Sequence, residues 1–322
     1  MSDNKVVIVL VNYNGHNDTI ECLESLKKIK YTNYSIIVVD NSSSELSIEF
    51  IEAWARGQVK SIKTNYKDIV YPLSKSVEKI HIINEGDELL ELNELTIIKA
   101  ENRGFAAANN VALRAIENKN YEYVWLLNND CIVTRDALDV LVKDINNRTQ
   151  DVGILGATLY DYYQPDVIQS IGGVLNKFFG TVKQLNEISS IKLLDYPVGA
   201  SMLVKRKFIE DVGGLNEDFF LYYEEVDWVM RGMKKGYNFG VNEEKLIFHK
   251  EGASTKGDNR KVASKSEVSD LSSLKSRLIF MKSHFPRRIL LVKLGFVIVL
   301  FNRIRRRRFD LLPKIIRILF DA

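Results

Sequence analysis

The chain has 322 residues, 46% of them hydrophobic and 27% charged, a globular balance that suits one large α/β domain or two smaller ones. Its two cysteines, Cys22 and Cys131, are too few for a disulfide framework and are expected to be buried free thiols. We expect no signal peptide, because the N-terminus lacks a basic n-region and an apolar region that ends at a small-residue cleavage site. We expect no membrane span, because no apolar run reaches ~18 residues. The net charge of +3 is uneven, since residues 275–322 hold thirteen Lys and Arg against two Asp. This basic segment predicts an anionic partner.

Strand-like and helix-like segments alternate over the first 145 residues. Continuous apolar runs predict buried strands, and apolar residues at helical spacing predict helices. The predicted strands cover 5–13, 34–40, 95–100 and 123–130, and the predicted helices cover 18–29, 45–56 and 104–118. This alternation predicts a parallel sheet that binds its ligands at the carboxyl ends of the strands.

The remaining segments have a different character. An insertion near 57–95 is longer than a crossover needs, and its acidic part, 78–95, is expected to form a hairpin or loop. From residue 151, short strand-like runs with scattered glycines lead to a helix over "EEVDWVMRGMKKG". The segment "NFGVNEEKLIFHKEGAS" then predicts strand, turn, strand and loop.

Polar clusters stand where predicted strands end or helices begin. They are "NYN" (12–14), Asp40, "NND" (128–130), "YYEEVD" (222–227) and His249. Each has an ordinary structural explanation, such as a turn, a helix cap or a carboxylate in the first turn of a helix. None of these clusters assigns a function by itself. The function has to be inferred from their order along the chain.

Six blocks in order carry a resemblance to a known family. They are "VVIVLVNYNG", "SIIVVDNSSS", "ENRGFAAANN", "YVWLLNNDCIV", "VGASMLVKRKFIEDVGGLNEDFFLYYEEVDWVMRGMKKGY" and "IFHKEGAS". Over roughly residues 5–285, apart from the insertion, the chain resembles the family 2 glycosyltransferases, especially their bacterial rhamnosyltransferase-like branch. The resemblance implies the GT-A fold, in which a Rossmann-like nucleotide-binding half with a mostly parallel central sheet is fused to an acceptor-binding half.

The same resemblance implies a domain plan. We expect the glycosyltransferase domain to cover 1–270, with its nucleotide-sugar half at about 1–150 and its acceptor half at about 151–270. Residues 271–322 are expected to form a helical, basic segment that lies in a membrane interface or forms a dimer. Its arginines favour an anionic membrane surface, and no nucleic-acid-binding module accompanies them.

By resemblance, the polar clusters of the first half bind the donor. Asp40 would accept a hydrogen bond from a pyrimidine N3–H, which favours uracil or thymine over cytosine. Gly104 would let the backbone approach the nucleotide closely. The expected donor-binding residues are Asn12, Tyr13, Asn14, Asp40, Asn102, Arg103, Gly104, Asn109, Asn128, Asn129 and Gly173.

The "NND" cluster occupies the place of the family's DxD motif. Asp130 is the expected ligand of a divalent cation, and His249 matches a histidine that completes the metal site in several relatives. Oxygen ligands fit Mg²⁺ or Mn²⁺, and the imidazole favours Mn²⁺. The sequence departs from the motif at Asn128, which replaces an aspartate and removes one negative charge.

The "EEVD" cluster resembles the block that supplies the base of an inverting transferase. Glu225 aligns with that base, and Glu224 and Asp227 are its rivals. Gly199 and Ala200 are expected beside the acceptor. Trp228 would present its ring to an acceptor sugar, with a place in the core as the alternative.

The sequence therefore predicts an inverting, metal-dependent glycosyltransferase, cytoplasmic and peripheral on the inner face of the cell membrane. It would move L-rhamnose from dTDP-rhamnose, or a hexose or galactofuranose from UDP, onto a cell-surface polysaccharide or a lipid-linked glycan precursor. One alternative, a sugar-1-phosphate nucleotidyltransferase, needs a Gly-rich basic N-terminal loop that "NYNGHND" lacks. The other, a non-catalytic glycan-binding module, is suggested only by Asn128.

Overall fold

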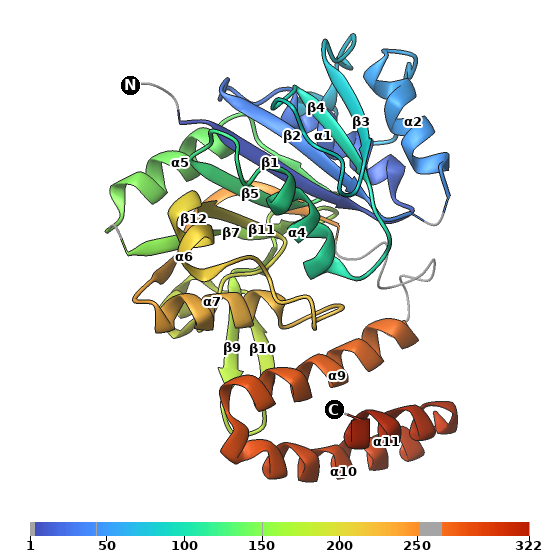
Figure 1. Cartoon of the computed structure of the whole chain (residues 1–322), viewed down its shortest axis with the longest axis vertical. Coiled ribbons are helices and arrows are strands. Elements are labelled where there is room, and N and C mark those ends of the chain that lie inside the picture. The colour runs from blue at the N-terminus through green and yellow to red at the C-terminus, as the bar shows by residue number, and fades with distance from the viewer. Residues whose placement is uncertain (1–3, 43, 150, 251–265, 322) are drawn as a thin grey trace.

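A single large sheet runs through the computed structural model, which describes residues 4–42, 44–149, 151–250 and 266–321. Its ten strands follow the order β3-β4-β2-β1-β5-β11-β7-β12-β6, with β8 paired to β7. The first five are parallel: β1 (Val6–Asn12), β2 (Tyr34–Asp40), β3 (Ile80–Asn84), β4 (Leu95–Lys99) and β5 (Tyr123–Asn128). The others are β6 (Cys131–Val133), β7 (Val152–Asp161), β8 (Ile168–Ser170), β11 (Ser201–Lys205) and β12 (Asn238–His249). β11 is antiparallel to both β5 and β7, so the second half joins the sheet of the first (Figure 1).

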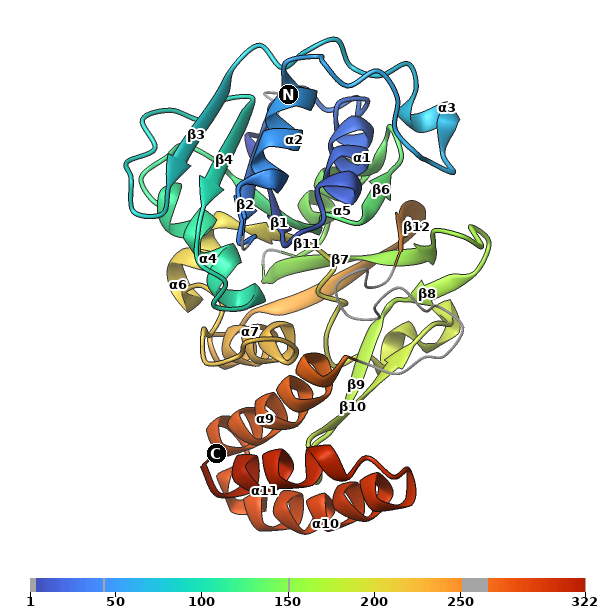
Figure 2. The ribbon, with the colours of Figure 1, turned by 90° about the vertical axis from the view of Figure 1, so that its right-hand side faces the viewer.

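Helices cover both faces of this sheet (Figure 2). Ile8 and Leu10 of β1 enter one core with α1 (His16–Leu26), α2 (Leu46–Ala55) and α5 (Ala137–Asn147). Val7 and Val9 enter the other core with α4 (Phe105–Ala115), α6 (Arg206–Val212) and α7 (Glu224–Lys234). Because alternate side chains of β1 are buried on opposite faces, the strand has an uninterrupted apolar sequence.

Two sequence predictions need correction. The segment 78–95 is neither a hairpin nor a loop throughout: Ile80–Asn84 form β3, which pairs in parallel with β4 and extends the sheet by one edge strand, and residues 85–94 form the predicted loop. Ile83 of β3 is buried in the second core, which gives this acidic segment an apolar anchor. The predicted strand, turn and strand from residue 238 are one strand, β12, whose pairing with β7 shifts register between Asn242 and Ile247. The predicted turn is therefore an irregularity within β12, and the last residues of "HKEGAS" lie outside the described part of the chain.

A helical unit packs at the end of the second half of the fold (Figures 1 and 2). It consists of α9 (Glu267–His284), α10 (Ile289–Arg305) and α11 (Leu312–Asp321), joined by short 3₁₀ turns at Pro286–Arg288 and Phe309–Leu311. Phe280 of α9 and Phe296 of α10 are fully buried in the second core. The helices are therefore part of the folded body. Within the described part of the chain, none of the helices has the length and hydropathy required to cross a bilayer.

The smaller elements complete the second half of the fold and the insertion. The β9–β10 hairpin (Gly172–Asn176 and Thr181–Leu185) reaches from the sheet towards the helical unit (Figure 2). A short helix, α3 (Lys67–Val70), lies in the insertion, and a 3₁₀ helix spans Ile188–Leu193. Cys22 and Cys131 are buried free thiols, as expected.

Candidate active site

The carboxyl ends of β1, β2 and β5 form one polar edge. In the sheet register, Asn12 faces Asp40 and Val11 faces Asn128. The Asn12 side-chain amide donates to Oδ1 of Asp40, which also accepts from the Ser42 hydroxyl at 2.8 Å. Burial raises the pKa of Asp40, although these hydrogen bonds oppose the shift. Asp40 is therefore held in place by its neighbours at the position predicted for a base-reading carboxylate.

Asn12 and Asn129 are scaffold residues beneath this edge. The Asn12 Oδ1 accepts from the Gly15 N–H at 3.1 Å, from the Thr19 hydroxyl at 2.9 Å and from the Asn129 amide at 3.3 Å. The Asn129 amide also donates to the Thr19 hydroxyl at 2.8 Å. Both amides therefore fix the turn after β1. Beside them, Asn14 has a φ of +53° and its N–H donates to Ser42, while Tyr13 is 45% exposed and open to a ligand.

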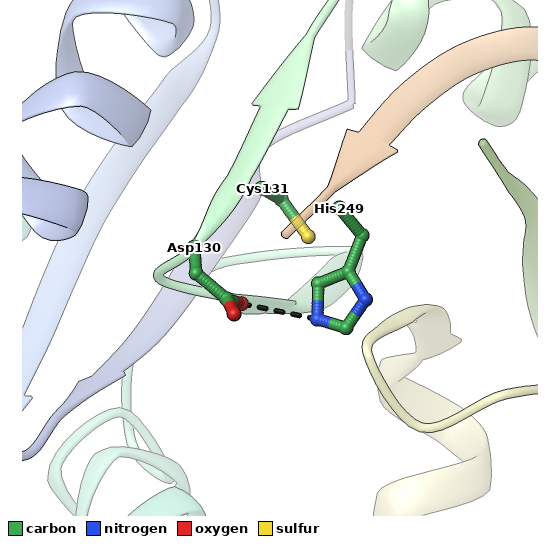
Figure 3. A group of neighbouring side chains, drawn as sticks. All are labelled: Asp130, Cys131 and His249. Carbon is green, nitrogen blue, oxygen red and sulfur yellow. Dashed lines mark ion pairs between the residues drawn. The ribbon is translucent and has the colours of Figure 1, made fainter. Parts of the chain in front are cut away.

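Asp130 and His249 meet where β5 and β12 end (Figure 3). The Oδ1 of Asp130 lies 3.0 Å from Nε2 of His249, and both side chains are about nine-tenths buried. The other ring nitrogen, Nδ1, lies 2.6 Å from Oε1 of Gln169, whose amide donates to the His249 carbonyl at 3.1 Å. If Nδ1 carries the proton towards Gln169, Nε2 presents its lone pair beside Asp130. The sequence did not mark Gln169, because its contact with His249 spans 80 positions.

These residues fit a divalent cation. The potential ligand atoms of Asp130, Cys131 and His249 all lie within 4.8 Å of one another. Carboxylate oxygen and imidazole nitrogen suit Mn²⁺ and, less strongly, Mg²⁺, whereas the soft sulfur of Cys131 suits neither. The amide of Asn128 lies 3.4 Å from Nε2 of His249, so the residue that departs from the motif borders the same site.

Glu224 and Glu225 open α7 after an unusual backbone turn. Tyr222 and Tyr223 have φ angles of +71° and +73°, in the left-handed region that non-glycine residues rarely adopt. Burial raises the pKa of Glu225 to about 7. Burial, and then the charge of Glu225, raise the pKa of Glu224 well above its usual value. Within the described residues, the buried Oε2 of Glu224 has no hydrogen-bond partner.

Glu225 has the environment that a general base requires. It is only half-buried, unlike Glu224, and its side chain borders Gly199, where an added Cβ would lie 3.6 Å from Cβ of Glu225. A carboxylate with a pKa of about 7 is a stronger base than an ordinary one and is still ionised at neutral pH in a large fraction of molecules. Gly199 and Glu225 therefore lie side by side, and their contact with an acceptor stays a prediction.

Asp227 does not suit the role of a rival base. Its Oδ2 accepts from Nε of Arg231 at 2.7 Å, and its Oδ1 lies 2.7 Å from Nε2 of His284. Burial opposes ionisation, but the hydrogen bonds from His284 and Arg231 hold the pKa of Asp227 below its ordinary value. A carboxylate with low basicity and with both oxygens occupied is a structural ion, so the geometry favours Glu225.

Two predicted contacts are corrected by packing. Trp228 is fully buried against Phe208, with ring centroids 5.4 Å apart, and its indole N–H donates to the Gly213 carbonyl. It is a core residue and does not face an acceptor. Asn109 is 1% exposed and donates within α4 to the Phe105 carbonyl, so it does not present its amide to a donor.

The fold itself requires a glycine at position 104. Gly104 has a φ of +100°, and an added Cβ would lie 2.3 Å from the carbonyl oxygen of Phe220. Gly173 has a comparable constraint, because an added Cβ would lie 2.3 Å from the Tyr196 hydroxyl. Close backbone approach at both glycines thus serves internal packing, and donor contact at either stays a prediction.

The remaining predicted residues have defined places. The Asn102 side chain accepts from the Gly104 N–H at 3.2 Å, and Arg103 forms ion pairs with Glu85 and Glu217. Ala200 is buried, and its carbonyl accepts from the Asn128 N–H at 2.9 Å. Donor contact at Asn102 and Arg103, and acceptor contact at Ala200, stay predictions.

Comparison with known proteins relates this geometry to a family. The family model described as glycosyl transferase family 2 matches residues 7–69. A low-salt glycan biosynthesis hexosyltransferase of Haloferax volcanii is 23% identical over 245 residues, which cover 72% of this chain and 63% of the relative. A rhamnosyltransferase of Escherichia coli is 24% identical, covering 70% of this chain and 76% of the relative. A dTDP-rhamnosyl transferase of Shigella flexneri is 21% identical, covering 73% of this chain and 65% of the relative.

A solved structure supports the fold. A mannosyltransferase from Pyrobaculum calidifontis, in complex with GDP-Man and Mn²⁺, superimposes with a TM-score of 0.54 at 17% identity. The match covers 87% of this chain and 64% of the mannosyltransferase. The chain thus spans less than two thirds of that protein and of the haloarchaeal relative. The predicted resemblance is confirmed: residues 7–69 match the model of glycosyl transferase family 2, and the chain shares the fold of this mannosyltransferase.

Proposed function

We propose that this chain is an inverting, metal-dependent glycosyltransferase that uses a pyrimidine-nucleotide sugar, with dTDP-L-rhamnose as the first candidate donor. The observation that supports it best is the arrangement of three groups: Asp40 and the Asp130–His249 pair at strand ends, and Glu225 at the start of α7. The rhamnosyltransferases among the relatives support rhamnose, and UDP-hexose or UDP-galactofuranose are the other candidates.

Each group has a defined task in this proposal. Asp40 accepts a hydrogen bond from the N3–H of the base. Asp130 and His249 would hold the divalent cation, which when bound would supply positive charge beside the leaving diphosphate. Glu225 takes the proton of the acceptor hydroxyl while that oxygen forms a bond to the anomeric carbon. The bond from the anomeric carbon to the diphosphate oxygen breaks on the opposite side, and the configuration inverts.

A donor panel tests the proposal. We expect the purified chain with Mn²⁺ to release nucleoside diphosphate from one dTDP- or UDP-sugar, by hydrolysis or transfer, and to leave GDP-sugars intact. Released nucleotide is measured by a coupled assay, and the anomeric configuration of a transferred product by NMR. Absence of both turnover and binding for every pyrimidine-nucleotide sugar would overturn the proposal. A retained anomeric configuration would overturn the inverting mechanism alone.

We further propose that the acceptor is lipid-linked and that α10 rests on an anionic membrane. Leu290, Leu294, Ile298 and Phe301 recur every three to four residues along α10 and are 57–68% exposed. Val292 and Phe296, on the opposite side, are fully buried. The exposed stripe ends beside the basic cluster Arg303 and 305–308. Pairing of two such stripes would bring like charges together, so a lipid surface suits this face better than a second copy.

Vesicle flotation checks this prediction. The buried face of α10 is part of the core, so deleting the tail would damage the fold, and surface substitutions are the better probe. We expect the chain to float with vesicles that contain phosphatidylglycerol and to float less with neutral ones. Leu294→Glu with Phe301→Glu should reduce flotation at least about tenfold. The matched control is Leu90→Glu, at a 72% exposed site of the nucleotide half. Unchanged flotation of the double variant, or dimerisation through α10, would contradict the prediction.

A further inference from the structure

The turn that delivers Glu225 depends on residues far away in the sequence. Tyr222 and Tyr223 are both left-handed, immediately before α7 begins at Glu224. Bulky residues adopt this backbone only where the surroundings hold it, and such turns concentrate at functional sites. The contacts that hold these two tyrosines therefore influence where the following glutamates lie.

Helix α9 supplies most of these contacts. The Ser276 hydroxyl donates to the Leu221 carbonyl at 2.9 Å, and the Ser269 hydroxyl lies 2.6 Å from the hydroxyl of Tyr222. The ring of Phe280 packs against that of Tyr223, with centroids 5.5 Å apart. Three consecutive residues before α7 are thus each held by a different residue of α9.

The same helix also holds α7 one turn further on. The Nε2 of His284 lies 2.7 Å from Oδ1 of Asp227, and both side chains are at most 3% exposed. The Asp227 N–H donates to the Tyr223 carbonyl at 2.9 Å. Since Glu225 lies between the serine contacts and the His284 contact, α9 fixes its backbone on both sides.

The β9–β10 hairpin completes the support. The Tyr223 hydroxyl donates to the Gly180 carbonyl at 2.6 Å, and Nε of Arg277 donates to the Phe179 carbonyl at 2.6 Å. An added Cβ at Gly180 would lie 2.4 Å from the side chain of Met281, so the hairpin tip sits directly on α9 (Figure 2). Tyr223 is therefore held between the hairpin and α9.

We propose that α9 is the positioning element of the catalytic base: Ser269, Ser276 and His284 hold the left-handed Tyr222–Tyr223 turn and the first turn of α7, and thereby place the Glu225 carboxylate beside Gly199. The proposal rests on Glu225 being the base, as proposed above. It assigns to the C-terminal helical unit a role in the chemical step. Among the described residues, no hydrogen bond or ion pair joins any of the three to Asp40, Asp130 or His249, so their effect on the chemical step would pass through Glu225.

The test removes the two serine hydroxyls of α9 and leaves its apolar side chains in place. In Ser269→Ala with Ser276→Ala, we expect kcat to fall about tenfold or more, because loss of a positioning contact misaligns the base. The KM and Kd for the nucleotide-sugar should stay within about twofold, since the donor site is untouched. Ser269→Thr keeps the hydroxyl, so this single variant should retain most of the kcat of the unaltered chain. The control is Ser283→Ala, at an exposed serine of the same helix whose hydroxyl donates to the Ile279 carbonyl.

A cycle of variants tests the named contact. Tyr222→Phe and Ser269→Ala remove the two ends of one hydrogen bond, so their effects on kcat should not multiply when combined. Effects that multiply fully would show that the two hydroxyls act independently and would overturn this contact as the positioning one.

A measurement free of turnover separates this inference from the proposed function. Hydrogen–deuterium exchange of peptides that cover 219–230 should accelerate in the double serine variant and not in Ser283→Ala. Unchanged exchange overturns the inference, whether or not a donor has been found. Faster exchange with an unchanged kcat also overturns it, since the turn would then loosen without displacing the base. Failure of the wild-type chain to turn over any donor would instead overturn the proposed function, and the positioning role with it.

Discussion

Glu225→Gln is expected to lower kcat by about 10²- to 10⁴-fold while leaving donor affinity nearly unchanged, because the amide cannot accept the acceptor's proton. The isosteric replacement keeps the packing against Gly199. Nucleotide release at saturating donor measures kcat, and calorimetry with the nucleotide-sugar measures binding. Glu243→Gln, at an exposed position of β12, is the matched control.

The pH profile gives an independent check of the same residue. The basic form is active, and burial raises the pKa of Glu225 to about 7. We therefore expect kcat/KM to fall about tenfold per pH unit as the pH drops below about 7, and to level off above it. An unperturbed glutamate would hold its activity down to about pH 4 to 5.

The rival carboxylates give distinguishable results. Loss of activity in Glu224→Gln together with retained activity in Glu225→Gln would move the base to Glu224, whose pKa burial raises well above its usual value. Activity that persists at pH 5 would contradict both, because a protonated carboxyl cannot act as a base.

The sequence predicts the first half well for a physical reason. Central parallel strands are buried on both faces, so their apolar runs, and the polar residues that end them, are visible without tertiary information. This is why β1, β2, β4 and β5 lie where they were predicted, and why Asp40 and Asn128 lie on one edge. Ile83 is the one buried residue of the edge strand β3, so the short "IHIIN" pattern did not show that this strand pairs in parallel with β4.

Long-range contacts explain what the sequence could not predict. Gly104 has the conformation expected of a ligand-binding glycine, but the group that approaches it is the Phe220 carbonyl. From the sequence, Trp228 could equally contact a sugar or lie in the core, and its contact with Phe208 shows that it lies in the core. His284 meets Asp227 across 57 positions, with no local pattern to mark the pair. Residue type thus predicted the candidate site's chemistry, while the partner of each side chain depended on the fold.

Asp130→Asn is the second substitution with a large expected effect. It removes the carboxylate that lies 3.0 Å from His249, and with it the only negative charge among the three clustered ligand candidates. Loss of an outer partner of a metal ligand typically costs 10- to 100-fold in metal affinity, so loss of the ligand should cost at least about 100-fold. Mn²⁺ titration in the presence of UDP or dTDP, followed by electron paramagnetic resonance, measures this directly. Asp166→Asn, at a side chain that is 94% exposed, is the control.

Two milder variants locate the cation more sharply. Gln169→Leu leaves Asp130 and His249 intact but removes the acceptor at Nδ1, so Mn²⁺ affinity should fall about tenfold. Asn128→Asp restores the charge that the family motif carries there, within reach of His249, and should raise Mn²⁺ affinity at least about tenfold. A general loss of stability would not explain a lower Mn²⁺ affinity in Gln169→Leu together with a higher Mn²⁺ affinity in Asn128→Asp. If Asp130→Asn binds Mn²⁺ as tightly as the unaltered chain, the cation lies elsewhere, and the polar edge binds the donor through hydrogen bonds alone.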